Sequence, residues 1–218
     1  MAFPQNVRTK ALLWCDRHCC LCKKACGVNI EVHHLVPESE GGGNEIDNAI
    51  PLCFDCHSEV MRYNIEHPRG TKYKIDELKA RREQVYEEFT RHLVPPLHYE
   101  ITQIIPGGYA RTFPDVGFVI RHVGDSLQVR VRVIVASLFN GKSETLPSDL
   151  YSGKKLWNLN PRLMFSGHFE MPRELIPKDR PLELRVVVSI IDQYEREHPQ
   201  LPTGFVYVAD KNYWYAEP

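Results

Sequence analysis

The pattern of apolar and polar residues changes character near residue 95. Before that point, apolar residues recur at helical spacing in two segments, residues 5–17 and 75–93. In the second segment Asp76 and Glu77 stand in the first turn, where acidic side chains suit the helix dipole. The prolines at 95 and 96 cannot continue a helix. We therefore expect a domain boundary there, with one domain over residues 1–95 and a second over residues 96–218.

Strand-like alternation dominates the second part of the chain. Val129, Val131, Val133 and Val135 alternate with other residues at the period of two that a β-strand produces. Further strand-like runs cover residues 116–123, 163–169, 182–191, 204–209 and 213–215. Short strands separated by turn residues are typical of an antiparallel β-sandwich. The last part, residues 185–218, resembles the final strands of an immunoglobulin-like sandwich.

The first part mixes helices with two short strands. Residues 28–36 read as a strand, and a polar stretch with three successive glycines at 41–43 reads as a loop. Residues 49–62 supply a second strand and then a helix. The whole chain is therefore expected to be α+β, with a small mixed N-terminal domain and an all-β C-terminal domain.

Composition and charge restrict the classes of function that we expect of this chain. The chain has 218 residues, with 27 Lys and Arg against 28 Asp and Glu, and both halves are near neutral. Nucleic-acid binding would therefore rest on local clusters, a metal ion or an oligomer, because no broad positive field exists. No stretch approaches the roughly 20 apolar residues of a membrane span, and the N-terminus lacks the apolar core of a signal peptide. We expect a soluble, cytoplasmic protein with no membrane partner.

Cysteine spacing indicates a metal site. All seven cysteines lie in the first 56 residues, an odd number that argues against a disulfide framework. Two Cys-x-x-Cys pairs, Cys19/Cys22 and Cys53/Cys56, can bind one ion as a closed tetrahedral zinc site of structural type. Two alternatives stay open. Cys26 could replace Cys19, or the pairs could be unrelated buried or redox-active thiols.

Histidines lie between and beside these cysteine pairs. The run from residue 31 to residue 57 reads EVHHLVPESEGGGNEIDNAIPLCFDCH. It resembles the signature of the HNH endonuclease family in its four-cysteine zinc-knuckle variety. The resemblance covers about residues 8–62, and we expect it to extend through the helix to residue 93. It implies a ββα-metal fold, in which a β-hairpin carries the histidine pair and a helix carries the last histidine.

The resemblance also implies a role for each motif residue. His33 and His57 would bind a catalytic divalent metal, His34 would be the general base, and Asn48 would hold the loop so that His34 is aimed. The chemistry of these residues is compatible with those roles. An imidazole with a pKa near 6.5 can accept a proton from water at neutral pH, and a metal ion can stabilise charge on a phosphodiester. Neighbouring strand residues point to opposite sides, so both histidines reach one centre only at the strand's edge or where the pleat is distorted.

One departure from the family bears on the metal. Some members have another histidine one turn after the last one, where this chain has Met61. With two imidazole ligands the site is open, which favours Mg²⁺ or Mn²⁺ over Zn²⁺ for catalysis. The nearby Asp55 and Glu59 are expected to be solvated surface charges. Basic residues that could follow a DNA backbone are Lys23, Lys24, Arg62, Arg69, Lys72, Lys74, Arg81 and Arg82. A solvated helix face explains Arg81 and Arg82 at least as well.

These features predict a metal-dependent endonuclease that hydrolyses DNA, most readily double-stranded DNA. The near-neutral charge favours an enzyme that is recruited, oligomerised or activated through its β-domain by a protein or ligand, as in a bacterial defence or mobile-element system. The alternative is a zinc-containing module or adaptor that binds nucleic acid or protein without cutting. Arg130, Arg132 and Arg185 could form a basic face on the β-domain, although the solvated side of a sheet explains them as well.

Overall fold

The fold is described from a computed structural model that covers residues 3–62, 73–104, 115–139, 142–145, 152–169, 182–211 and 213–216. The chain divides into two compact units. The first unit contains Met1–His92 together with Tyr194–Arg196, and the second contains Leu93–Gln193 and Glu197–Pro218. Each unit has its own hydrophobic core. The two are therefore described separately.

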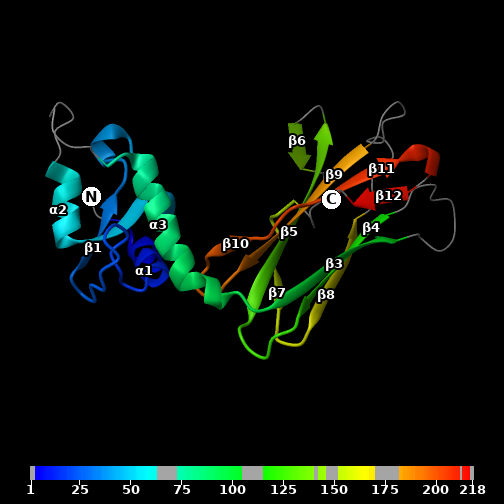
Figure 1. The fold of residues 1–218 in the computed structure, drawn as a ribbon, viewed down its shortest axis with the longest axis horizontal. Helices are drawn as coiled ribbons and strands as arrows, with labels where there is room; N and C mark the ends of the chain where they lie inside the picture. The colour runs from blue at the N-terminus through cyan, green and yellow to red at the C-terminus, as the bar shows by residue number, and fades with distance from the viewer. Residues whose placement is uncertain are drawn as a thin grey trace. The chain divides into compact units, whose positions relative to one another are not determined.

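The first unit is built around a two-stranded antiparallel sheet (Figure 1). Strands β1 (Ile30–His34) and β2 (Ala49–Cys53) pair so that His34 lies opposite Ala49 and Ile30 lies opposite Cys53. Helix α2 (Phe54–Arg62) follows β2 directly. This β1–β2–α2 order is the arrangement that the HNH resemblance implies.

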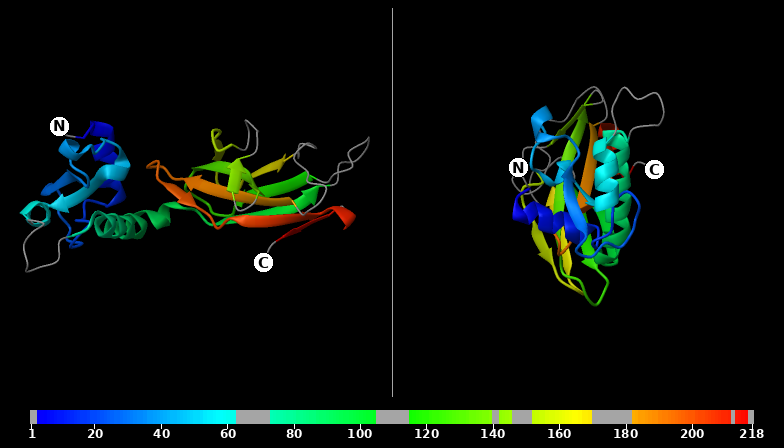
Figure 2. Two further views of the ribbon diagram at one scale, coloured as in Figure 1. Left: turned by 90° about the horizontal axis from the view of Figure 1, so that it is seen from above. Right: turned by 90° about the vertical axis from the view of Figure 1, so that its left-hand side faces the viewer.

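Two further helices pack on this sheet. Helix α1 (Gln5–Trp14) precedes it, and α3 (Ile75–Thr90) lies alongside β2 (Figure 2) and continues into a short 3-10 turn, Arg91–Leu93. Both helices begin at the predicted residues. The predicted ends at 17 and 93 are wrong by three residues for each α-helix, since turns replace the last part of each segment. Leu78, Val85 and Tyr86 of α3 are buried in the core with Ile50 and Leu52 of β2.

A loop joins β1 to β2 and contains two single 3-10 turns, Glu38–Glu40 and Ile46–Asn48. Gly41 ends the first turn with a φ of 87°, a left-handed conformation that glycine adopts without a steric penalty. The backbone N–H of Leu35 donates to the carbonyl of Asn48 at 2.8 Å, so the loop closes directly beyond the last pair of the ladder. His34 is therefore the last residue of its strand.

The second unit consists of antiparallel strands in two sheets. The larger sheet has the order β12-β11-β9-β5-β6, with β10 also paired to β9 and β7 to β5, and the smaller has the order β3-β4-β8. The strands are β3 (Leu97–Ile104), β4 (Asp115–His122), β5 (Val129–Phe139), β6 (Lys142–Thr145), β7 (Trp157–Leu159), β8 (Met164–Phe169), β9 (Leu182–Ile191), β10 (Glu197–Pro199), β11 (Thr203–Val208) and β12 (Tyr213–Ala216).

Both sheets contribute to one core. Val116, Phe118 and Ile120 of β4 belong to the same buried cluster as the alternating valines of β5 and apolar residues of β9. The α+β class is thus confirmed, with an all-antiparallel second unit. The immunoglobulin-like connectivity of a sandwich stays a prediction. The predicted strands at 116–123, 129–135, 163–169, 182–191, 204–209 and 213–215 are confirmed within one residue at their starts, whereas β3, β6, β7 and β10 were not predicted.

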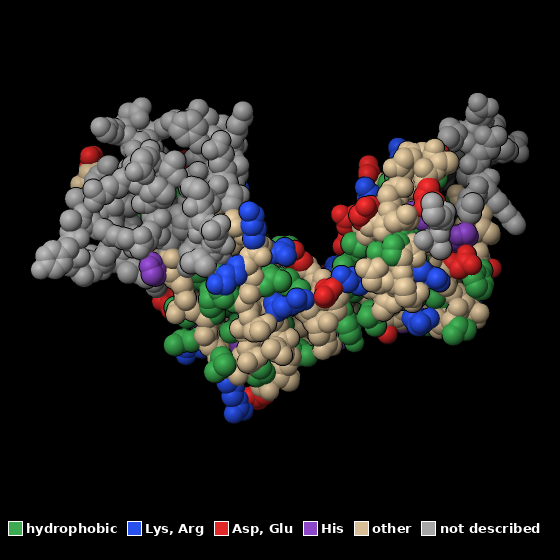
Figure 3. Space-filling model, turned by 180° about the vertical axis from the view of Figure 1, so that it is seen from behind, with side chains coloured by type: hydrophobic (Ala, Val, Ile, Leu, Met, Phe, Trp, Pro, Cys, Tyr) green, Lys and Arg blue, Asp and Glu red, His purple; other side chains and the backbone are tan. Residues whose placement is uncertain are grey.

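The arginines singled out in the second unit lie on one face of the larger sheet. Arg130 and Arg132 are both on β5, and Arg185 of β9 is paired with Ala136 of β5. Arg132 Nη1 donates to Glu197 Oε2 at 2.5 Å. An ion pair therefore offsets one of these charges. Figure 3 shows basic and acidic side chains together on the described parts of one face of the molecule.

No helix within the described residues is long and apolar enough to cross a membrane.

Candidate active site

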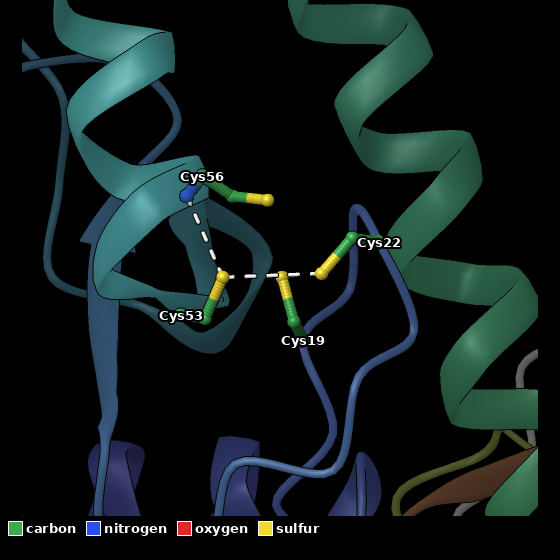
Figure 4. Close-up of side chains that lie close together, drawn as sticks. All are labelled: Cys19, Cys22, Cys53 and Cys56. Carbon is green, nitrogen blue, oxygen red and sulfur yellow. Dashed lines mark hydrogen bonds between the residues drawn. The ribbon is translucent and has the colours of Figure 1, made fainter.

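Four cysteines from two separate segments meet in the first unit. The sulfur atoms of Cys19, Cys22, Cys53 and Cys56 all lie within 4.8 Å of one another (Figure 4). Cys22 Sγ and Cys53 Sγ are 3.8 Å apart. A tetrahedral ion with metal–sulfur bonds of about 2.3 Å separates its sulfur ligands by about 3.8 Å. Four thiolates in this arrangement form a closed set of the kind that zinc prefers, so the group fits a structural metal ion.

The first cysteine pair is held by a tight turn. The backbone N–H of Cys19 donates to the carbonyl of Lys24 at 2.9 Å, and that of Lys23 donates to the carbonyl of Cys19 at 2.9 Å. Lys23 adopts a φ of 60°, which closes the turn. The neighbouring Cys20 donates its backbone N–H to the carbonyl of Pro51 at 2.9 Å. This last bond joins the turn to β2, the strand that leads to the second cysteine pair.

The thiols of the cluster differ in how easily they lose a proton. Burial opposes ionisation of Cys19, but hydrogen bonds from backbone groups of Cys22, Cys53 and Leu21 hold its pKa below the usual value. Burial raises the pKa of Cys22, and burial followed by the neighbouring Cys53 thiol raises the pKa of Cys56. Four negative sulfurs so close together require a compensating positive charge. A bound metal ion supplies that charge, and its binding releases the protons.

The other cysteines lie outside this group. Cys26 Sγ donates to the carbonyl of Lys24 at 3.0 Å, and Cys15 Sγ lies 3.5 Å from the carbonyl of Leu12. The alternative with Cys26 in place of Cys19 is therefore not the arrangement of the structure. Cys15 and Cys20 are fully buried.

A pair of histidines forms a second group beside the cysteines. His33 of β1 and His57 of α2 face each other with Nδ1 and Nε2 3.2 Å apart and the rings at 85°. Two nitrogens bound to one ion at about 2.1 Å stand roughly 3.0 to 3.4 Å apart in octahedral or tetrahedral geometry. The spacing therefore suits a shared ion. Glu31 Oε2 lies 3.6 Å from the same His57 nitrogen.

Burial keeps His33 uncharged. Burial first, and then the nearby His57 and His34, lower the pKa of His33 to about 4. A neutral imidazole offers the lone pair that a metal ion needs. Glu31 was not singled out from the sequence. The strand period could have indicated it, because residues 31 and 33 of one strand share a face.

His34 has a different set of neighbours, as its position next to His33 on a strand requires. Its Nε2 atom lies 2.8 Å from Asn44 Oδ1, and Asn44 Nδ2 donates to Glu38 Oε1 at 3.0 Å. Phe3 stacks on the His34 ring with centroids 3.8 Å apart. None of these three neighbours was singled out from the sequence. The fold of the loop brings Asn44 and Glu38 to His34, and Phe3 reaches it from the segment before α1.

Asn48 ties the loop together. Its Oδ1 accepts from the Val36 backbone N–H at 2.8 Å, and its Nδ2 donates to the carbonyls of Val36 and Gly43 at 2.9 and 2.8 Å. All three bonds of this side chain are to backbone. Gly42 lies so close that a β-carbon there would be 1.8 Å from the Val36 carbonyl oxygen and 2.8 Å from Asn48 Nδ2. Asn48 therefore connects the segment directly after His34 to the glycine run.

Arg82 was expected as a possible DNA contact, and this prediction is wrong. Its side chain is buried, and Nη1 donates to the carbonyls of Ile46, Asp47 and Ala49 at 3.3, 2.7 and 3.1 Å. These carbonyls flank Asn48, so Arg82 supports the candidate site from α3.

The other charged residues considered from the sequence lie at the surface or outside the described residues. Arg81 is exposed and pairs with Glu77, and Lys23 pairs with Glu88. Lys24 and Lys74 are exposed, as are Asp55 and Glu59. Arg69 and Lys72 fall outside the described residues, and the side chains of Met61 and Arg62 are likewise not described.

Two strands followed by a helix, with histidines from the first strand and the helix facing each other, define a ββα-type candidate metal centre next to a four-cysteine site. Residues 18–61 match the family model of HNH endonucleases. The first unit therefore carries an HNH domain, and the recognised signature is confirmed.

Two other similarities accompany this match. The chain is 48% identical over 31 residues to the type IV methyl-directed restriction enzyme EcoKMcrA of Escherichia coli (strain K12), over 14% of this chain and 11% of that protein. The X-ray structure of the Northeast Structural Genomics Consortium target SoR45 aligns with 50% of this chain and 84% of its own, at 7% identity and a TM-score of 0.32. A TM-score this low does not establish a shared fold. The family match and the enzyme relative point to a nuclease-type function.

Proposed function

We propose that the protein is a metal-dependent endonuclease that hydrolyses phosphodiester bonds of DNA. In this proposal His34 is the general base, His33 and His57 hold a catalytic divalent ion, and Asn48 holds the loop behind His34. The four cysteines bind a structural zinc ion. The observation that carries the proposal is the 3.2 Å approach of His33 to His57, directly beside His34, inside a segment that matches the HNH family.

In the proposed mechanism the two adjacent histidines at the end of β1 have different roles, because they lie on opposite faces of the strand. His34 would accept the proton of the water that attacks the scissile phosphate. A divalent ion at His33 and His57 would stabilise negative charge on the phosphate and on the departing 3′ oxygen. Two imidazoles and the nearby Glu31 leave half of an octahedral shell to water and phosphate oxygens. This open donor set favours Mg²⁺ or Mn²⁺.

The DNA substrate follows from the family and from the restriction enzyme that the segment resembles. Double-stranded DNA is the substrate we propose, in a bacterial defence or mobile-element setting. The net charge of −1 supports a nuclease that binds DNA weakly alone. The all-β second unit would then supply recruitment, through an oligomer, an activating protein or a ligand.

Plasmid cleavage tests the proposal. Purified zinc-loaded protein is incubated with supercoiled plasmid and Mg²⁺, Mn²⁺ or EDTA, alongside His34→Ala and His92→Ala. His92 is an exposed histidine outside the site and serves as the matched control. We expect cleavage that requires the divalent ion, a loss of roughly 10²- to 10⁴-fold in His34→Ala, and normal rates in His92→Ala.

Two results would contradict the proposal. Unchanged cleavage by a folded His34→Ala protein would remove the assigned base. DNA binding without cleavage in any metal, by wild-type protein with its zinc and fold intact, would favour the binding module or adaptor instead.

A further inference from the structure

The imidazole of His34 is fixed by side chains that no motif names. Asn44 Oδ1 lies 2.8 Å from His34 Nε2, and Asn44 Nδ2 donates to Glu38 Oε1 at 3.0 Å. Glu38 Oε1 itself lies 4.0 Å from His34 Nε2. The three side chains thus form a short chain of contacts that ends on one nitrogen of the ring.

The direction of these hydrogen bonds follows from the carboxylate. An ionised Glu38 can only accept, so Asn44 must present its NH₂ group to Glu38. The amide oxygen of Asn44 then faces His34 and can also only accept. His34 Nε2 must therefore carry the proton and donate it. In the neutral ring this leaves the lone pair on Nδ1.

Phe3 fixes the plane of the same ring. Its ring stacks on His34 with centroids 3.8 Å apart and an angle of 14°, and Phe3 is itself only 4% exposed. A ring held on one face by Phe3 and at one edge by Asn44 has little freedom to rotate. The His34 side chain keeps 16% of its surface exposed, so water can reach it.

We propose that Asn44 and Glu38 are positioning residues that hold His34 as the Nε2–H tautomer, which makes Nδ1 the atom that accepts the proton from water. This inference rests on the proposed function of His34 as general base. Partners that orient a metal-bound imidazole through its second nitrogen typically contribute about 10- to 100-fold to metal affinity or activity, and the same orienting contact acts here on the base. We expect losses of that size in kcat, with the KM for DNA unchanged, because neither residue needs to contact the substrate.

The test reads the proton on the ring directly, independently of cleavage. The full-length, zinc-loaded protein is labelled with ¹⁵N-histidine, and the His34 signal is assigned by its absence from His34→Ala. We expect a slowly exchanging proton on Nε2 in the wild type, which is lost in Asn44→Ala and weakened in Glu38→Gln. Ser39→Ala, an exposed change in the same 3-10 turn, is the matched control and retains the signal.

A conservative variant separates positioning from general damage. Asn44→Asp keeps an acceptor oxygen facing Nε2. The Nε2–H signal that is lost in Asn44→Ala should therefore be present in Asn44→Asp, even where repulsion from the Glu38 carboxylate perturbs the loop. In cleavage assays Asn44→Ala should lower kcat by about 10- to 100-fold with KM unchanged, while Ser39→Ala stays normal.

Each outcome decides a different statement. A proton found on Nδ1 in the wild type overturns the tautomer. An Nε2–H signal that survives in Asn44→Ala overturns the role of Asn44 in holding that tautomer. Loss of the signal with unchanged kcat overturns the positioning role. Absence of cleavage by the wild type with the NMR pattern as expected overturns the nuclease, and with it the catalytic purpose, but leaves the hydrogen-bond arrangement established.

Discussion

His33 Nδ1 lies 3.2 Å from His57 Nε2, with the two rings edge to face at 85°. The contact joins the first strand of the hairpin to the helix that follows the second strand. Nitrogens this close hold at most one proton between them, and burial disfavours a second proton, and with it a positive charge, on His33. His33 is thus built to remain neutral.

The first prediction concerns the protonation of His33. Its pKa in the folded protein is about 4, below the usual 6.5, and burial is the larger cause. An NMR titration of zinc-loaded protein without added divalent ions should show this low midpoint. In His57→Ala the midpoint should rise but stay below 6.5, because the burial remains.

The same shift has a consequence for stability. Between pH 6.5 and about 4 the unfolded chain binds more protons at His33 than the folded protein does. The contribution of His33 to the free energy of unfolding is therefore complete above pH 6.5 and is lost as the pH falls toward 4. The pH dependence of the urea midpoint should flatten in His33→Gln, and an unchanged dependence would contradict the assignment.

The second prediction concerns the cysteine cluster. Cys53→Ser should lose the bound metal and unfold the first unit, because a structural zinc ion contributes directly to folding. Cys26→Ser changes a neighbouring thiol outside the cluster and should keep one zinc ion per chain. Metal content by elemental analysis, together with circular dichroism, measures both. A zinc-replete, folded Cys53→Ser protein would disprove the four-cysteine site.

The third prediction compares two adjacent arginines of α3. Arg82→Met removes the donor to three backbone carbonyls and should destabilise the first unit by roughly 2–4 kcal/mol. Arg81→Met removes only an exposed pair with Glu77 and should cost less than about 0.5 kcal/mol. Hydrogen exchange of the β2 amides in increasing urea reports the difference. Equal effects of the two changes would mean that Arg82 does not support the loop.

The fourth prediction concerns the glycine run. An alanine at Gly42 would place its β-carbon 1.8 Å from the Val36 carbonyl oxygen, so the bonds of Asn48 must shift. The atoms nearest to a β-carbon at Gly43 would all belong to the end of the Glu45 side chain, which can rotate away. We expect Gly42→Ala to lower cleavage at least about 10-fold at unchanged zinc content, as displaced supporting contacts do. The cleavage rate of Gly43→Ala should stay near that of the wild type. A larger loss of cleavage in Gly43→Ala than in Gly42→Ala would refute the role of the close contact between Gly42 and the Val36 carbonyl.

Local patterns in the sequence predicted the elements that carry the site. The strand that ends at His34 and the Cys-x-x-Cys spacing are properties of a few consecutive residues, so they were visible before the fold was known. The short strands β7 and β10 are three residues each, too short to show a period, and pairing with β5 and β9 defines them.

The surroundings of the site depended on contacts between distant residues. The burial of Arg82 follows from how α3 lies beside β2, and its charge alone suggested the surface instead. Asn44 and Phe3 reach His34 from a loop and from the chain's beginning, and no spacing rule links them. A side chain's type indicated what it can do, whereas only the fold determined which groups it meets.

Cys56 and His57 are consecutive residues at the start of α2, and they belong to different groups, the sulfur cluster and the histidine pair. In the proposed enzyme the zinc ion holds the first turn of α2 through Cys56. The same turn therefore also orients His57, a ligand of the catalytic ion. The two ions would then bind in a fixed order, since the second pocket takes shape only after the first is filled. A cell short of zinc would accordingly accumulate an inert protein, however much magnesium it contained.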